Sequence, residues 1–214
     1  MTVHVLDESP KTDAAFGTSP DDRTLEQRLA SGFILVDKPA GPTSHQLAAW
    51  ARDLLGLDRL GHGGTLDPFA TGVLPLMTGR CMKITNKILK HQKTYIAVFR
   101  FRTMPEINDL KATMATMTGR IYNVPPEVSA VKVQVRTRTI HAFELLDTDG
   151  QDAVARITCD AGTYIRTMAR DMGLLLNTPV SLKELRRENS GMFDLNDCIT
   201  MDQLADAVWL WKEL

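Results

Sequence analysis

Strand-like and helix-like segments are mixed along this sequence without a regular alternation, and this order limits the possible folds most. Apolar runs or alternating apolar residues predict strands at residues 33–36, 95–101, 128–140 and 153–160. Apolar residues at helical spacing predict helices that begin near Thr43 or Ser44, after Thr103, at Thr163 and after Thr200. Regular alternation of strands and helices would indicate a Rossmann or barrel fold, so we instead expect a mixed sheet with flanking helices.

The expected helices carry recognisable ends and apolar faces. In the first, Leu47, Trp50, Leu54 and Leu57 share one face and Gly56 lies near the end. Thr103-Met-Pro-Glu106 and Thr200-Met-Asp-Gln203 have the form of capping boxes, which precede the apolar sets Ile107, Leu110, Met114, Met117 and Leu204, Val208, Trp211. In residues 163–176, the residues Ile165, Met168, Met172 and Leu175 point inward, so Arg166 lies at the border of the apolar face.

Composition excludes several classes of protein. The chain has 214 residues, of which 43% are hydrophobic, and its longest apolar stretches, such as residues 73–77, are far too short to cross a bilayer. The first eight residues lack the basic and apolar regions of a secretory signal, so we expect a cytoplasmic protein. Three separated cysteines without CxxC spacing argue against a disulfide framework and a zinc site.

The formal net charge of −1 hides opposite local biases. Residues 31–190 hold 21 Lys and Arg against 15 Asp and Glu, whereas both ends of the chain are acidic. Acid-free runs contain Lys83, Lys87, Lys90, Lys93, Arg100 and Arg102, and then Lys132, Arg136 and Arg138. Such local positive fields suit a polyanionic ligand, of which nucleic acid is the commonest. Judged from charge alone, the alternative that we favour is an ordinary solvent-exposed face.

Residues 61–68, Gly-His-Gly-Gly-Thr-Leu-Asp-Pro, are typical of a tight, exposed loop that presents one carboxylate, that of Asp67. Pro68 biases Asp67 toward an extended backbone, and the glycines let another backbone approach closely. Neither the Walker lysine nor the GxGxxG spacing is present, which disfavours a nucleotide-binding loop. The alternative to a reactive carboxylate is a purely structural turn.

Five segments of the chain occur in a characteristic order. They are Asp37-Lys-Pro-Ala-Gly-Pro-Thr-Ser44, residues 61–75, Lys93-Thr-Tyr95, Gly162-Thr-Tyr-Ile-Arg166, and Leu185-Arg-Arg187 with Ser190-Gly191. Together they resemble the TruB family of pseudouridine synthases, from about Phe33 to Trp211. Pro-Pro-Glu-Val-Ser-Ala-Val-Lys132 and Arg136-Thr-Arg138 look more like the archaeal and eukaryotic dyskerin branch, which works with box H/ACA guide RNA, than the bacterial enzyme. The resemblance implies an α+β catalytic fold with a largely antiparallel, mixed sheet.

The resemblance also implies the reaction, the isomerisation of a uridine within RNA without a metal or another cofactor. The N1–C1′ bond breaks, the uracil turns, and C5 bonds to C1′. Asp67 aligns with the family's catalytic aspartate, which would attack either uracil C6 or the sugar C1′. Arg166 matches the arginine that pairs with this aspartate, and Tyr95 matches the tyrosine that stacks on the target base. Judged alone, Arg166 would be a surface ion pair and Tyr95 a core residue.

The same resemblance suggests residues that contact RNA. A flipped uracil needs a walled pocket, and Leu185 matches the family's pocket leucine. His62 resembles the histidine that touches RNA near the flipped base. The basic side chains of Lys83, Lys87, Lys90 and Lys93 would contact phosphates. Lys38 is included with them, although packing beneath the catalytic loop is the role that we favour for it.

We expect a flexible arm over residues 1–31, with one helical turn at residues 25–29, and a catalytic domain over residues 32–214. The family's usual PUA domain is not expected within this sequence, so RNA docking would be weaker or depend on partners. The expected partners are rRNA or tRNA, guide RNA and the small H/ACA proteins, with no membrane. The alternatives are a stand-alone enzyme for the tRNA T-loop and a non-catalytic RNA or ribonucleoprotein scaffold.

Overall fold

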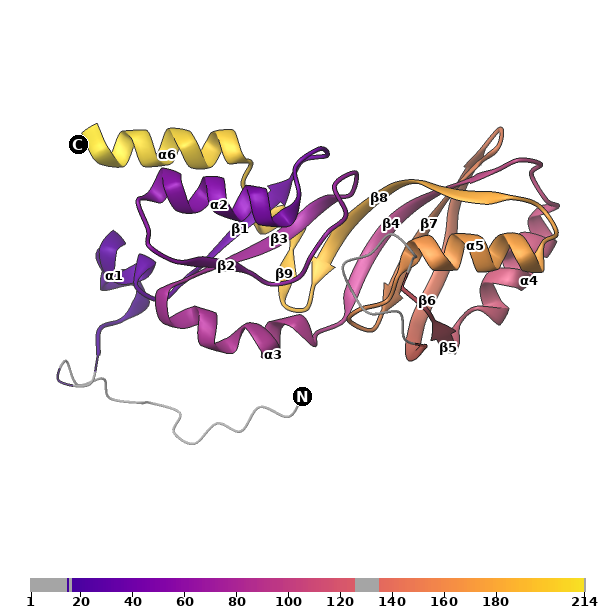
Figure 1. Cartoon of the computed structure of the whole chain (residues 1–214), viewed down its shortest axis with the longest axis horizontal. Coiled ribbons are helices and arrows are strands. Elements are labelled where there is room, and N and C mark those ends of the chain that lie inside the picture. The colour runs from indigo at the N-terminus through magenta and orange to yellow at the C-terminus, as the bar shows by residue number, and fades with distance from the viewer. Residues whose placement is uncertain (1–14, 16, 126–134, 214) are drawn as a thin grey trace.

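One long sheet runs through the part of the chain that the structure, a computed structural model, describes: residues 15, 17–125 and 135–213 (Figure 1). Its strands are β1 (Phe33–Lys38), β2 (Leu60–His62), β3 (Thr71–Thr78), β4 (Lys93–Phe101), β5 (Gly119–Asn123), β6 (Arg136–Asp149), β7 (Asp152–Cys159), β8 (Val180–Ser190) and β9 (Phe193–Asp194). The α-helices are α1 (Leu25–Leu29), α2 (Ser44–Leu55), α3 (Thr85–Leu89), α4 (Ile107–Thr116), α5 (Ile165–Leu175) and α6 (Met201–Glu213). Short 3₁₀ helices are η2 (Pro20–Asp22), η3 (Gly79–Ile84) and η4 (Leu195–Asp197).

The sheet has the order β1-β3-β8-β4-β7-β6-β5, with β2 paired to β3 and β9 paired to β8. Each of these strand pairs is antiparallel except β3 with β8, which is parallel. The predicted α+β fold with a mixed, largely antiparallel sheet is therefore confirmed. The parallel pair joins Gly72 to Arg187 and brings two segments that are distant in sequence side by side.

Helices cover both faces of the sheet around β1 and β3. Leu74 and Leu76 pack with residues of α2 and α6, whereas Val73 and Met77 pack with Ile88 of α3. The alternation follows from the pleat of β3, which sends successive side chains to opposite faces. Figure 1 shows α2 and α6 together above this part of the sheet and α3 below it.

A second core lies between β4, β7 and the helices α4 and α5. Ala97, Phe99 and Phe101 of β4 are almost completely buried, as their alternation predicts. Leu66 and Ala70, which flank Asp67, belong to the same cluster. The loop that carries Asp67 is thus anchored by apolar side chains on both sides of the carboxylate.

The ends of α2 are as predicted. The Thr43 hydroxyl accepts a hydrogen bond from the Gln46 N–H, and the Gln46 side chain accepts one from the Thr43 N–H. Gly56 follows the helix in the left-handed conformation, with φ of 65°. The reciprocal cap therefore fixes where this helix begins, immediately after the first sequence motif.

The buried face of α2 differs from the predicted one. Leu47 is buried as expected, but the face continues through Ala48, Ala51 and Leu55. Trp50 is 54% exposed, so its assignment to this face is wrong. The two alanines let the helix approach the sheet and rotate the buried face away from the indole.

Helix α4 starts later than predicted. Leu110, Met114 and Met117 are buried as expected, but Glu106 is the N-cap residue and makes no side-chain cap hydrogen bond. The predicted capping box at Thr103 is wrong because the Thr103 backbone instead bonds the Thr178 hydroxyl, through both its N–H and its carbonyl. These contacts hold the chain before α4 against the start of β8.

Helix α5 agrees with its predicted pattern except at the end. Ile165, Met168 and Met172 are buried, whereas Leu175 is 57% exposed and was wrongly predicted to point inward. Leu175 is the last residue of the helix, where the covered face ends. Arg166 lies on the border of the buried face, as expected.

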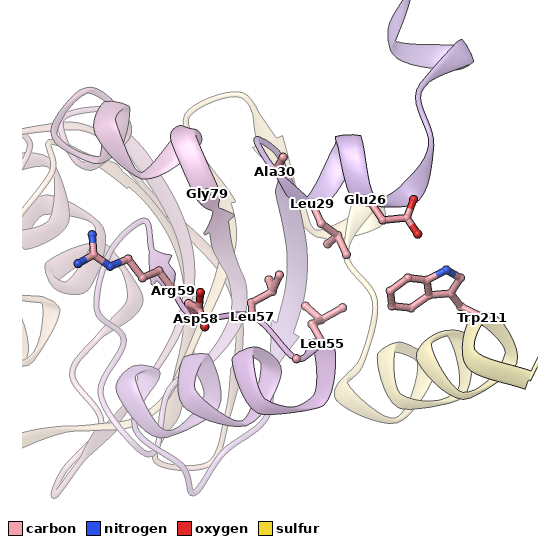
Figure 2. A pocket seen from close by; sticks show the side chains of 10 residues that line it. Glu26, Leu29, Ala30, Leu55, Leu57, Asp58, Arg59, Gly79 and Trp211 are labelled. Carbon is pink, nitrogen blue, oxygen red and sulfur yellow. The ribbon is translucent and has the colours of Figure 1, made fainter.

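The two terminal helices, α1 and α6, lie close to the connection after α2. The predicted α1 turn is present, and the Thr200–Gln203 capping box of α6 is confirmed by both of its hydrogen bonds. Trp209 is 62% exposed, whereas Trp211 lines a cavity of about 420 Å³ with Leu29, Leu55 and Leu57. Figure 2 shows the Trp211 ring between these helices.

Two sequence predictions extend beyond the described residues. Residues 128–134 of the expected strand at 128–140 lie outside them, and β6 continues to Asp149. Most of the expected N-terminal arm, residues 1–14 and 16, also lies outside them. No helix in the described ranges combines the length and the apolar character needed to cross a membrane.

Replacing Gly72 with alanine should strongly destabilise the fold. An added Cβ would overlap the Arg187 carbonyl oxygen, and Gly72 has a φ of +103°. We expect the free energy of unfolding in urea to fall by about 2–4 kcal/mol, because both the strand contact and the backbone conformation are affected. Gly119→Ala is the matched control, since Gly119 has φ of +98° but an added Cβ there would meet no described residue within 4 Å. Equal losses in both variants would contradict the importance of the contact.

Candidate active site

A cavity of about 600 Å³ opens where the Asp67 loop, β4, β8 and the start of α5 meet. Its lining includes Asp67, Tyr95, Arg166 and Leu185, which the sequence analysis selected. These residues come from four separate segments of the chain, so the fold brings together side chains that are far apart in the sequence. The volume is in the range of pockets that hold small organic molecules, and one pyrimidine base would fit.

Asp67 and Arg166 form an ion pair in this cavity. One guanidinium nitrogen of Arg166 lies 2.9 Å from a carboxylate oxygen of Asp67. Both side chains are about one-third exposed, at 33% and 32%, so they remain accessible from the cavity. The charge-assisted hydrogen bond fixes the direction of the carboxylate, and no guanidinium of the described residues bonds its second oxygen.

The start of α5 is held in place by β5 and the residue after it. The Asn123 side chain donates to the Tyr164 carbonyl and accepts from the Tyr164 N–H, at 3.3 and 2.8 Å. The Thr167 hydroxyl donates to the Val124 carbonyl at 2.7 Å. These bonds occur on either side of Arg166 and therefore fix the helix turn that carries it.

Polar side chains of the first motif hold the Asp67 loop. Ser44 bonds both the N–H and the carbonyl of Leu66, at 2.9 and 3.3 Å. The Lys38 ammonium donates to the carbonyls of Pro39, Pro68 and Ala70, at 2.9, 3.1 and 2.8 Å. The main chain on both sides of Asp67 is therefore tied to β1 and α2.

Lys38 supports the loop, which is the role favoured for it from the sequence, and its burial is unfavourable to the RNA contact that was also predicted. Its side chain has no exposed surface. Burial, together with the nearby charge of Arg187, lowers its pKa, while the charge of Asp67 acts in the opposite direction. A lysine whose ammonium is enclosed by backbone carbonyls has no donor left for a phosphate.

Tyr95 and Leu185 lie on the neighbouring strands β4 and β8. Tyr95 is 9% exposed, and its burial raises the pKa of the phenol, although the charge of Arg187 and a hydrogen bond to it lower that pKa in part. The phenol is therefore protonated at neutral pH. Leu185 is 7% exposed and belongs both to the core and to the cavity wall.

Lys93 also lines the cavity, but its burial leaves little surface for the predicted phosphate contact. The side chain is 4% exposed, and its ammonium donates to the carbonyls of His91, Leu89 and Ile88, at 2.6, 3.1 and 3.4 Å. Burial, followed by the charge of Arg187, lowers the pKa of Lys93 to about 8. Lys93 therefore holds the segment after α3 in place, as lysines near helix C-termini can do.

The other predicted RNA contacts lie at or beyond the rim of the cavity. Lys90 is exposed and belongs to its lining, while Lys83 and Lys87 are exposed on η3 and α3. His62 lies at the end of β2, where its Nε2 is 3.3 Å from Nδ1 of His45. Burial, followed by the charges of His45 and Arg187, lowers the pKa of His62.

Arg187 is a site residue that the sequence analysis did not select. It is 1% exposed, lines the cavity and bonds the carbonyls of Val73 and Gly64. Its neighbour Arg186 points elsewhere and forms a forked ion pair with Asp37, at 3.1 and 2.6 Å. The Leu-Arg-Arg motif pointed to this segment. However, no strand was predicted there, and only the alternation of side chains along a strand shows that Arg187 faces the cavity while Arg186 does not.

Comparison with known families agrees with this geometry. Residues 52–165 match the TruB family pseudouridylate synthase N-terminal domain, which covers more than half of the chain. The chain belongs to the TruB family. Residues 166–214 match the tRNA pseudouridylate synthase B C-terminal domain, and residues 4–48 match the DKCLD domain.

Curated relatives and solved structures extend this finding. Probable tRNA pseudouridine synthase B from Methanococcus aeolicus is 42% identical over 98% of this chain and 63% of its own length, and the protein of that name from Methanocaldococcus jannaschii is 40% identical over 98% and 62%. A crystal structure of a Cbf5-Nop10-Gar1 complex matches with a TM-score of 0.90 and 37% identity, over 97% of this chain and 63% of that one. An H/ACA RNP bound to a substrate RNA containing 2′-deoxyuridine matches with a TM-score of 0.87 and 35% identity, over 97% and 62%.

These matches confirm the predicted family and its dyskerin-like branch. This TruB-family chain spans a little less than two-thirds of the length of the relatives that it matches.

Replacing Lys93 with methionine should change how stability depends on pH. Between pH 8 and 10.5 the unfolded chain holds more protons at Lys93 than the folded chain does, so this residue makes wild-type stability rise with pH. Over this pH interval, the free energy of unfolding in urea should rise by at most about 3 kcal/mol more in the wild type than in Lys93→Met. The control Lys90→Met, at an exposed lysine, should follow the wild-type profile. Parallel profiles for Lys93→Met and the wild type would contradict the cost of burying this charge.

Proposed function

We propose that this chain isomerises uridine to pseudouridine within RNA. The observation that carries the proposal is the Asp67–Arg166 ion pair in a cavity that Tyr95 and Leu185 also line. A fixed, accessible carboxylate can act as a nucleophile, and an aromatic and an aliphatic side chain can enclose a flat base. Membership of the TruB family supports the same reaction.

The proposed reaction conserves the atoms of the RNA except for an exchange of protons. The N1–C1′ bond breaks, the uracil turns within the cavity, and C5 bonds to C1′. C5 then loses its proton and N1 gains one, so the product is an isomer of the substrate. Asp67 attacks carbon in this scheme, either at uracil C6 or at C1′, and is later released.

Arg166, Tyr95 and Leu185 each have a proposed role that suits their surroundings in the cavity. Arg166 orients the Asp67 carboxylate and stabilises its charge. Tyr95 offers its ring to the uracil and a protonated phenol that can exchange a proton. Leu185 closes the apolar wall. A base inside a duplex cannot reach this carboxylate, so the target uridine must be flipped out of its stack.

Exposed basic residues supply the surface for the RNA backbone in this proposal. Lys90 stands at the cavity rim, and Lys83 and Lys87 lie on the preceding exposed turns. His62 is the proposed contact near the flipped base. Contacts of this kind contribute affinity but little choice of sequence. Selection of the target uridine would therefore come from RNA pairing or from partners.

Guide-directed modification is the form of this activity that we favour. The similarity to structures of Cbf5 with Nop10 and Gar1, and of an H/ACA RNP with substrate RNA, supports a catalytic subunit that works with guide RNA and small proteins. The tRNA names of the curated relatives support the second candidate, a stand-alone enzyme for tRNA. The same cavity could serve both forms.

Replacing Asp67 with asparagine should abolish pseudouridine formation, because the amide is not a nucleophile and cannot pair with Arg166 as an ion. RNA with tritium at uridine C5 provides the assay, since the reaction releases that hydrogen to water. We expect wild-type release and at least about a thousandfold slower release from Asp67→Asn. Asp53→Asn, which alters an exposed aspartate on α2, should keep the wild-type rate.

The assay uses unmodified tRNA alone and a target RNA with H/ACA guide RNA, each with and without the small proteins. Release only with guide RNA would support the favoured form, and release from tRNA alone would support the second candidate. If the wild type released no tritium in any arm, or if Asp67→Asn kept its rate, the proposed function would fail.

Removing Lys83 and Lys87 should weaken RNA binding without slowing the chemical step. For the double variant Lys83→Ala/Lys87→Ala we expect a higher Kd and a salt dependence with a slope shallower by about 1–2, because two phosphate contacts are lost. Lys111→Ala/Lys212→Ala removes the same charge from α4 and α6 and serves as the control. Identical salt slopes for the two double variants would show that η3 and α3 do not face the RNA.

A further inference from the structure

Arg187 is the largest fully buried side chain among the described residues, and it lies in the middle of the sheet. Its Cα is paired with Gly72 of β3 on one side and with Tyr95 of β4 on the other. No carboxylate in the described part of the chain lies within 4.0 Å of its guanidinium. A charged group buried without an ionic partner is costly, so its hydrogen bonds to the protein carry particular weight.

The guanidinium joins the two ends of the Asp67 loop. Its Nε donates to the Val73 carbonyl at 2.8 Å, and one terminal nitrogen donates to the Gly64 carbonyl at 3.1 Å. Gly64 lies three residues before Asp67 and Val73 lies six residues after it. One rigid planar group therefore spans the base of the loop, while Ser44 and Lys38 hold its middle.

An irregularity in β8 directs the arginine toward the cavity. Thr94 pairs with Asn189 and Tyr95 pairs with Arg187, so Glu188 is the extra residue of a bulge. Arg187 and Leu185 both line the cavity, whereas Glu188 forms an ion pair with Arg156 at 3.0 Å. The bulge thus sets the guanidinium beside Tyr95 at the position where β8 meets both β3 and β4.

The charge of Arg187 also reaches the other titratable groups of the site. It lowers the pKa values of Lys38, Lys93 and His62, after burial as the first cause, and it partly offsets the raised pKa of Tyr95. The cavity therefore has a fixed positive charge in its wall in addition to that of Arg166. Such a field favours a carboxylate and any negative charge that develops on a base.

We propose that Arg187 is the positioning residue of the site: by bridging Gly64 and Val73 it fixes the Asp67 loop, and thereby the carboxylate, relative to Tyr95. This inference rests on the proposed function but makes a separate claim about loop order. Lysine cannot replace the arginine, because an ammonium lacks the planar fork that reaches both carbonyls. Arg187 acts through the loop and need not touch the RNA.

The test compares Arg187→Lys with Arg156→Lys, a control that loosens the ion pair at the same bulge. Single-turnover tritium release at saturating RNA should fall about a hundredfold in Arg187→Lys, with Kd for RNA within about twofold of wild type, because a carboxylate displaced by about 1 Å costs this much rate. Amide hydrogen exchange over residues 62–74 should become faster. Arg156→Lys should leave both the rate and this exchange at the wild-type level.

Gly64→Ala perturbs the same contact without removing the buried charge, because Gly64 has a φ of +128°, a backbone conformation that strains an alanine and would shift the Gly64 carbonyl. It should also lower the rate and increase exchange in the loop, and it decides the question if Arg187→Lys does not fold. Wild-type rate and exchange in the folded Arg187 variant, or in Gly64→Ala, would overturn the proposal. The proposal would also be overturned if these variants lost activity and RNA affinity only in proportion to the fraction of unfolded protein. If the wild type itself released no tritium, the proposed function would fail, while hydrogen exchange would still test the positioning.

Discussion

The candidate site depends on hydrogen bonds from buried cations to the main-chain carbonyls of one loop. Lys38 bonds the carbonyls after Asp67, and Arg187 bonds those at the two ends of the loop. An irregular loop cannot satisfy its carbonyls within itself as a helix does, so buried donors must do so. Satisfying these groups also determines the direction in which the Asp67 carboxylate points.

The same arrangement concentrates positive charge beneath the cavity. Lys38, Lys93 and Arg187 are all buried there, and each lysine has a lowered pKa because of burial and the charge of the arginine. Interior charges of one sign are unfavourable unless hydrogen bonds and nearby anions compensate. The cavity is consequently adapted to negative groups, first the Asp67 carboxylate and then a polyanionic ligand.

Much of the site could be predicted from the sequence, because Asp67, Tyr95, Arg166 and Leu185 each lie in a recognisable motif. The errors have physical causes. Lys93 was predicted to contact phosphates as part of a basic run, and Lys38 was included although packing beneath the loop was favoured for it. Sequence periodicity cannot report that backbone carbonyls enclose an ammonium. Arg187 was missed because its role depends on strand pairing.

For the fold as well, features set by neighbouring residues could be predicted, whereas features set by distant contacts could not. The caps of α2 and α6 are local, so Thr43 and Thr200 could be identified from neighbouring residues. The start of α4 is set by a contact between Thr103 and Thr178, which no local pattern reveals. The exposure of Trp50 likewise depends on two alanines that pack against the sheet.

The parallel pairing of β3 with β8 has a consequence for how the protein is made. Gly72 meets Arg187 only after more than a hundred intervening residues have been synthesised, so the site has a high contact order. A nascent chain that ends before β8 has a carboxylate loop held by Ser44 and Lys38 but not by Arg187, and its strands β3 and β4 each lack their pairing with β8. The bonds from Arg187 to this loop are therefore among the last contacts of the candidate site that can form during synthesis.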